Sequence, residues 1–173
     1  MNKQELVKRL NTSFAELIKA GEAVKQENFN VSKNNKWTAA ENLAHLVTST
    51  KMTIAGYTLP KILPALLYGK TKSGSRSFED IVTLYKGALQ NGGKASGVYV
   101  PKKTDYNKER LIHSLREGAF KLADAVTEKW TEEQLDSYRI AHPLLGKLTA
   151  RELLYFTIYH NGHHTSTIAE LYI

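Results

Sequence analysis

The sequence contains no cysteine. This absence excludes a disulfide scaffold, a thiolate zinc site, a cysteine nucleophile and a cysteine-ligated iron–sulfur cluster, so any metal ion must bind to histidine or carboxylate. The sequence also lacks an apolar run of about 18 residues that could span a bilayer. Its N-terminus has the pattern of an amphipathic helix instead of a signal segment. We therefore expect a cytoplasmic protein with no membrane partner.

Acidic residues are in the minority, with 17 Asp and Glu against 24 Lys and Arg and a formal net charge of +7. A basic surface attracts nucleic acids and other polyanions. The lysines, however, are scattered along the whole chain, and only short basic runs such as residues 70–76 occur. Solvated surface lysines, with some attraction for small anionic substrates, are the favoured interpretation, and nucleic acid is not the expected partner.

The chain of 173 residues is expected to form a single helical bundle domain over residues 1–173. Folding a chain of this length hides roughly 70% of the surface that the unfolded chain exposes. Apolar residues recur at three- and four-residue spacings, which predicts amphipathic helices. The four main helices are predicted at residues 3–26, 38–58, 105 or 107 to 129, and 149–173.

Helix starts are marked by two capping boxes, Thr38 with Glu41 and Thr149 with Glu152. Asp105 or Asn107 can cap the third main helix. Lesser helices are predicted at residues 78–89 and within 130–135, whereas residues 69–77 and 136–147 are expected to be loops. Strand evidence is thin and confined to residues 98–100. The predicted fold is therefore all-α, an up-down four-helix bundle with a long crossover between the second and third main helices.

Three of the six histidines, His160, His163 and His164, fall within one stretch of five residues in the predicted last helix. A rotation of about 100° per residue places His160 and His164 about 40° apart and one turn from each other, as chelation of one ion requires. His163 points elsewhere and is expected beside the ligands or in solvent. Leu153 and Phe156 share the direction of the pair, so the two imidazoles face the core and need either hydrogen-bond partners or a cation. Both interpretations of the pair remain open at this point.

A third ligand would have to come from another helix, and His45 is the candidate. It lies among small and polar residues, which fits either an exposed surface or the lining of a cavity, and the surface interpretation is favoured for His45 alone. Glu41, one turn earlier, could orient this imidazole, but its capping box with Thr38 is the favoured role. His142 beside Pro143 could reach the mouth of the bundle, although an exposed loop position is the favoured interpretation.

The aromatic residues near these histidines are expected to be structural. Tyr155 and Tyr159 are predicted to pack between helices. Trp37 is predicted to anchor the entry to the second main helix, and Trp130 to do the same at the end of the third.

Two segments resemble a known family. The first is the run Trp37-Thr38-Ala39-Ala40-Glu41-Asn42-Leu43-Ala44-His45-Leu46, and the second is the run from Gly146 to Leu154 followed by His160-Asn161-Gly162-His163-His164. They are similar to the capped, histidine-bearing second helix and the histidine pair of the last helix in the DinB/YfiT-like superfamily of four-helix, metal-dependent bacterial enzymes. Thr165-Ser166-Thr167 stands where many members carry an Arg-Gly-Gln-type sequence, so the substrate-facing side of the last helix is expected to differ.

The resemblance implies that His45, His160 and His164 are the metal ligands. Glu41 and His163 are expected beside them from their places on the two helices. It also implies a divalent ion, zinc or nickel, and a hydrolase or a low-molecular-weight thiol S-transferase acting on a small-molecule substrate, with the thiol as possible co-substrate. Zinc on three histidines keeps an open position for a water or a thiolate.

Two alternatives from other classes are a non-catalytic helical binding or stress protein that retains the bundle, and a basic nucleic-acid-associated protein. The apolar face of Leu154, Ile158 and Ile168 fits either a homodimer interface or burial inside one bundle, and both alternatives stay open.

Overall fold

The computed structural model describes residues 1–173. Its elements in chain order are α1 (Lys3–Ala23), α2 (Gln26–Phe29), α3 (Ala39–Thr58), α4 (Ile62–Tyr68), α5 (Phe78–Gln90), the 3₁₀ helix η1 (Gly97–Tyr99), α6 (Lys108–Lys129), α7 (Glu132–Ser137), β1 (Arg139–His142), β2 (Gly146–Thr149) and α8 (Ala150–Tyr172).

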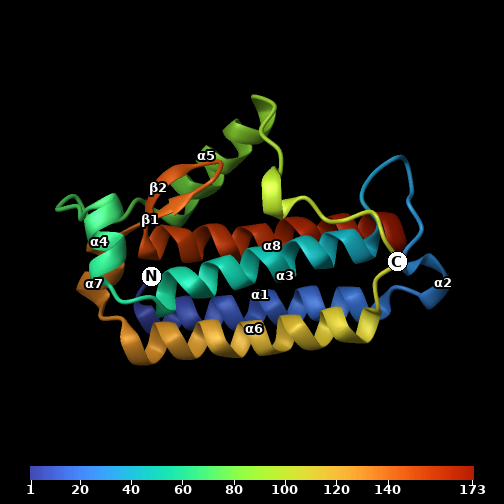
Figure 1. The fold of residues 1–173 in the computed structure, drawn as a ribbon, viewed down its shortest axis with the longest axis horizontal. Helices are drawn as coiled ribbons and strands as arrows, with labels where there is room; N and C mark the ends of the chain where they lie inside the picture. Colours follow the sequence, from blue (N-terminus) through green and yellow to red (C-terminus); the bar gives the residue numbers. More distant parts are fainter.

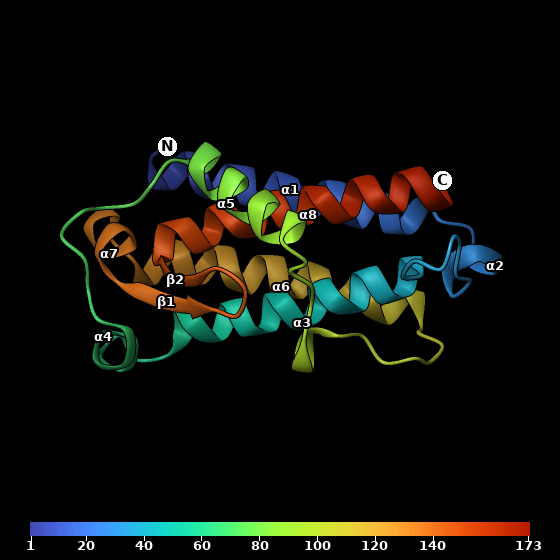
Figure 2. The ribbon, with the colours of Figure 1, turned by 90° about the horizontal axis from the view of Figure 1, so that it is seen from above.

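The four long helices α1, α3, α6 and α8 lie side by side as a bundle (Figures 1 and 2). Helices α1 and α8 run in one direction, and α3 and α6 run in the opposite direction (Figure 1). Two consecutive long helices can be parallel only if the chain returns between them, and residues 59–107 make this return with α4, α5 and η1. The predicted all-α four-helix bundle with a long crossover is therefore confirmed. None of its helices combines the length and the apolar composition that a bilayer crossing needs.

The predicted helix starts are set by side chains that bond the first free amides. Both expected capping boxes are present, with Thr38 and Glu41 at α3 and Thr149 and Glu152 at α8. Asn107 caps α6 and accepts a hydrogen bond from the amide of Arg110. Helix α1 ends three residues before the predicted boundary because the backbone becomes extended at its C-cap, and the next four-residue helix, α2, is separate.

The expectation of a loop over residues 136–147 was wrong. Helix α7 continues to Ser137, and β1 and β2 then form an antiparallel hairpin in which His142 pairs with Gly146. Strands of four residues are too short to show a period of two in the sequence. The sequence does indicate the turn through Pro143 and Gly146, and Gly146 has a positive φ of +74°, which favours glycine. Residues 97–99, in turn, are a 3₁₀ helix and not a strand.

The core is one cluster of apolar side chains drawn from all four long helices. Trp130 is buried at the end of α6, where its indole N–H donates to the carbonyl oxygen of Tyr57. Leu154 and Ile168 of the apolar α8 face are fully buried, and Ile158 packs partly buried against the core. This face of α8 therefore packs within the bundle.

Helices α3 and α6 approach closely where Gly118 faces Thr50. A Cβ added at Gly118 would lie 2.7 Å from the Thr50 methyl group, whereas one added at Gly162 on α8 would meet nothing within 4 Å. We expect Gly118→Ala to lower the free energy of unfolding by about 1–2 kcal/mol because the core is overpacked. Gly162→Ala should raise it by roughly 0.5–1 kcal/mol because alanine is the better helix former. Urea unfolding checks both variants, and a stabilised Gly118→Ala protein would contradict the close approach.

Candidate metal centre

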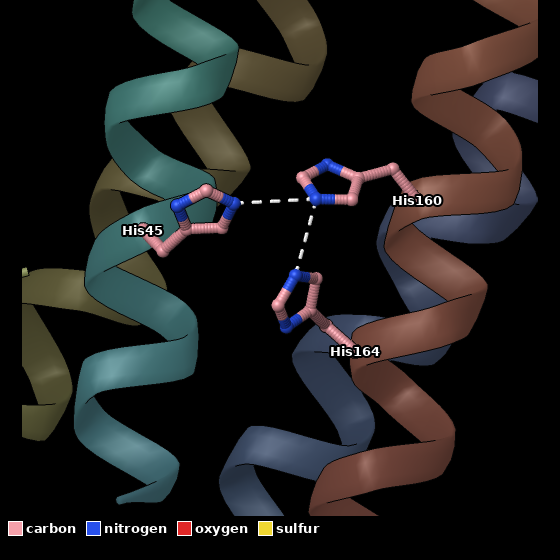
Figure 3. Close-up of side chains that lie close together, drawn as sticks. All are labelled: His45, His160 and His164. Carbon is pink, nitrogen blue, oxygen red and sulfur yellow. Dashed lines mark hydrogen bonds between the residues drawn. The ribbon is translucent and has the colours of Figure 1, made fainter. Parts of the chain in front are cut away.

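Three imidazoles from two helices meet inside the bundle (Figure 3). His45 comes from α3, and His160 and His164 come from successive turns of α8. The Nε2 atom of His160 lies 3.2 Å from that of His45 and 3.1 Å from that of His164. One nitrogen from each ring lies within 4.8 Å of the others. Two nitrogens bound tetrahedrally to one zinc ion would be about 3.3 Å apart, so these separations suit a shared ion.

His45 is held by the crossover. Its Nδ1 atom lies 2.7 Å from the carbonyl oxygen of Tyr99 in η1. Because a carbonyl oxygen can only accept, Nδ1 must carry the proton. The neutral ring therefore has its lone pair on Nε2, which faces the other two histidines. His45 is buried, so the surface position favoured for it from the sequence was wrong.

His164 is oriented by an amide side chain. Its Nδ1 atom lies 2.6 Å from Oδ1 of Asn42, whose amide nitrogen donates to the carbonyl oxygens of Trp37 and Thr38. These two donated bonds fix which end of the Asn42 side chain is oxygen. Nδ1 of His164 is consequently the donor, and its Nε2 lone pair also points into the cluster. Asn42 is 2% exposed, so water cannot take over this role.

His160 faces two lone pairs at once. Its Nε2 atom is within hydrogen-bond distance of both neighbouring Nε2 atoms, and a proton on it could be donated fully to only one of them. The ring lies against the ring of Phe156, with centroids 4.8 Å apart and an interplanar angle of 25°. A cation at the centre would accept lone pairs from all three rings. The donor set therefore fits a divalent metal ion that prefers nitrogen ligands.

The three rings are held in the neutral form that a metal ligand requires. Burial lowers the pKa of His45, and the hydrogen bond to Tyr99 offsets this in part. Burial lowers the pKa of His160 and of His164 well below the ordinary value, and repulsion between the clustered imidazoles adds to it. At neutral pH the Nε2 lone pairs are thus available without competition from protons.

The structure places Glu41 and His163 outside this cluster. The buried Glu41 carboxylate accepts from the amide of Thr38 in the capping box and pairs with Lys103 at 3.0 Å. His163 is half-buried, and its ring edge packs on His164 with centroids 5.2 Å apart. Glu41 therefore has the favoured capping role, and His163 is a neighbour of the three rings.

Trp37 does more than anchor the helix entry. Its ring is nearly parallel to that of His164, at 6.4 Å and 11°, and lies 5.2 Å from that of His45. Sequence reasoning missed this contact, and it missed the roles of Asn42 and Tyr99. Asn42 could have been noticed as a polar residue one turn from His45 on the same helix, but the Tyr99 carbonyl has no signature in the sequence.

A pocket of about 490 Å³ opens beside the imidazoles and is lined by residues of α3, α4, α5, the β1–β2 hairpin and α8. His142 lines it. This residue was favoured as an exposed loop histidine, but it is half-buried at the end of β1 with its ring centroid 4.2 Å from that of Phe156. The packing roles predicted for Tyr155 and Tyr159 agree with their edge contacts to Phe78 and Tyr85.

The sequence profile of the DinB superfamily matches residues 5–168. The chain belongs to this superfamily. Among solved structures it is similar to YfiT from Bacillus subtilis, described as a probable metal-dependent hydrolase with an unusual four-helix bundle topology. The TM-score is 0.64 at 19% sequence identity, and the match covers 97% of this chain and 84% of the other. This likeness concerns the fold. A comparison with curated proteins finds no match.

Proposed function

We propose that this protein is a metal-dependent enzyme that holds one divalent ion, zinc or nickel, on the Nε2 atoms of His45, His160 and His164. The observation that carries the proposal is the convergence of three neutral imidazoles, two of which have their lone pairs aimed inward by Tyr99 and Asn42. The family and the description of YfiT support it. An ion on three neutral ligands supplies Lewis-acid chemistry with its full charge and an open coordination position.

The reaction we propose is hydrolysis or the transfer of a low-molecular-weight thiol. The adjoining pocket gives a small-molecule substrate access to the three histidines. A thiol co-substrate would supply the sulfur nucleophile that the chain itself lacks, because it has no cysteine. The apolar rings of Trp37 and Phe156 flank the imidazoles of His164 and His160.

Metal analysis of protein purified without chelator or nickel resin tests the site. We expect one divalent ion per chain in the wild type and loss of it in His45→Ala and in His160→Ala. His163→Ala is the matched control, since it removes a neighbouring imidazole of α8 and should keep the ion. Stoichiometric metal in both ligand variants would overturn the site. Turnover of an ester panel or a thiol panel by the loaded protein then decides the reaction, and a loaded protein inactive on both would favour the binding-protein alternative.

Asn42 is expected to set the affinity of the site. Asn42→Leu removes the acceptor that fixes the tautomer of His164, and loss of such a partner typically weakens metal binding about 10–100-fold. Thr48→Val is the control, because the Thr48 hydroxyl bonds only to the Ala44 carbonyl of its own helix. Competition with a chromophoric chelator measures both affinities. Equal affinity of Asn42→Leu and wild type would show that this hydrogen bond does not orient the ligand.

A further inference from the structure

The pocket beside the three imidazoles is mainly apolar. Its walls come from α3, α4, α5, the hairpin and α8, and include Met52, Leu67, Leu89, Ile140, Leu153 and Phe156. Its volume of about 490 Å³ falls in the range of about 300–1,000 Å³ typical of small-molecule sites. Burial of an apolar chain or ring against these side chains removes it from water and is therefore favourable.

Apolar side chains also lead from the pocket to solvent. Leu63 and Leu67 of α4 line the pocket while remaining 41% and 63% exposed. The neighbouring Leu66 is 81% exposed but does not line the pocket. Leu63 and Leu67 are therefore solvent-exposed at the rim of the pocket, where they can contact an apolar ligand as it enters.

One polar group on this wall is fixed in direction. Nδ1 of His142 accepts hydrogen bonds from the backbone amides of Leu144 and Leu145 in the hairpin turn, at 3.2 and 3.0 Å. Both partners are donors, so Nδ1 is unprotonated and the ring proton lies on Nε2. Burial lowers the pKa of His142 to about 4, which keeps the ring neutral at pH 7.

The donor formed in this way is free. Nε2 of His142 has no hydrogen-bond partner in the protein, and it is not one of the fully buried side-chain atoms. The ring packs on Phe156, which in turn packs on His160. The free N–H group is thus one aromatic ring away from the candidate metal centre.

We infer that the substrate is a carbonyl compound with an apolar chain or ring, which lies along the leucine-rich wall while its oxygen accepts a hydrogen bond from Nε2 of His142. The inference rests on the proposed function for the reaction but not for binding. An acyl or enone group is also what hydrolysis or thiol addition would need.

Binding of a ketone series to metal-free protein tests the apolar wall. The probes are methyl butyl, methyl hexyl and methyl octyl ketone, measured by ligand-observed NMR on the metal-free wild type. Affinity should rise about fourfold per added methylene group until the pocket is filled. The metal-free protein separates the two proposals, because ketone binding should be seen there whether or not the three histidines hold an ion. Affinity independent of chain length would overturn the inference.

Two exposed leucines provide a matched pair for the same measurement. Leu67→Asp places a charge on the pocket wall and should weaken methyl hexyl ketone binding by about tenfold or more. Leu66→Asp changes an even more exposed residue of the same helix and should leave binding unchanged. Neither substitution disturbs the core. Equal binding by the two variants would show that the ketone lies elsewhere.

The role of His142 is tested with His142→Asn. The Asn oxygen can replace Nδ1 as acceptor for the turn amides, so the hairpin is kept while the Nε2 donor is lost. We expect about fivefold to tenfold weaker binding of methyl hexyl ketone. The matching alkene, in which CH₂ replaces the oxygen, should bind both proteins equally. Equal loss for ketone and alkene would mean that His142 only shapes the pocket, and no loss for either would exclude the hydrogen bond.

Discussion

Saturation with zinc is expected to raise the midpoint of thermal unfolding by about 10 °C. An ion that binds only the folded state at a thousandfold excess over its dissociation constant stabilises that state by about 4 kcal/mol. For a chain of this size, 1 kcal/mol corresponds to roughly 2–4 °C. The effect follows from geometry, because His45 lies more than a hundred residues before His160 and their nitrogens meet only in the folded bundle. Calorimetry with zinc or with chelator measures the shift.

The control is to measure, for each variant, the difference between its unfolding midpoint with zinc and its unfolding midpoint with chelator. His160→Ala should show a zinc-dependent shift of less than about 2 °C, whereas His163→Ala should respond like the wild type. Comparing each variant with itself removes any general loss of stability from the substitution. A full shift in His160→Ala would place the bound zinc somewhere other than the three histidines.

Replacing Arg151 is expected to give the largest loss of stability among single substitutions of charged residues. Arg151 is 6% exposed on the first turn of α8, and its guanidinium bonds Asp136 at 2.6 Å, the carboxylate of Glu132 and the carbonyl oxygen of Met1 at 2.9 Å. We expect Arg151→Met to lower the free energy of unfolding by about 3 kcal/mol, because a partly buried carboxylate loses its partner. Arg9→Met, which breaks only the exposed pair with Glu5, should cost less than about 0.5 kcal/mol.

The pH dependence of this loss has a definite sign. Burial alone would raise the pKa of Asp136, but the hydrogen bonds from Arg151 and Ser75 outweigh it, and the net pKa lies below the ordinary 3.8. A carboxylate with a depressed folded pKa stabilises the protein above its unfolded pKa, and this contribution disappears as the pH falls through the folded pKa. The difference between wild type and Arg151→Met in urea unfolding should therefore be full at pH 7 and shrink below about pH 4. A constant difference would contradict the ion pair as its cause.

The sequence predicted what local rules control. Helical periodicity located the long helices, and the pairs Thr38 with Glu41 and Thr149 with Glu152 marked two starts because a capping box involves residues three apart. The four-residue spacing of His160 and His164 likewise predicted two imidazoles that face the same way. His45 was predicted as the third ligand only through the resemblance to a family, because the residues around His45 favoured a surface position.

What the sequence did not predict depends on contacts between distant segments. The hairpin of β1 and β2 is too short for a periodic signal, and its turn decides that His142 lines the pocket. The Tyr99 carbonyl bonds His45 across 54 residues of sequence, and any residue type could present that oxygen. Asn42 is one of several polar residues on its helix, and only the packing of α3 against α8 selects it as the partner of His164.

The hydrogen bond from His45 to η1 links the candidate metal centre to the wall of the pocket. Tyr99 lines the pocket while its backbone oxygen holds the imidazole of His45. The neighbouring residues Lys94, Ala95 and Ser96 of the same crossover also border the pocket. A ligand that displaces this stretch of chain would break the hydrogen bond that orients His45. Ligand binding in the pocket would then be coupled to metal affinity at the three histidines.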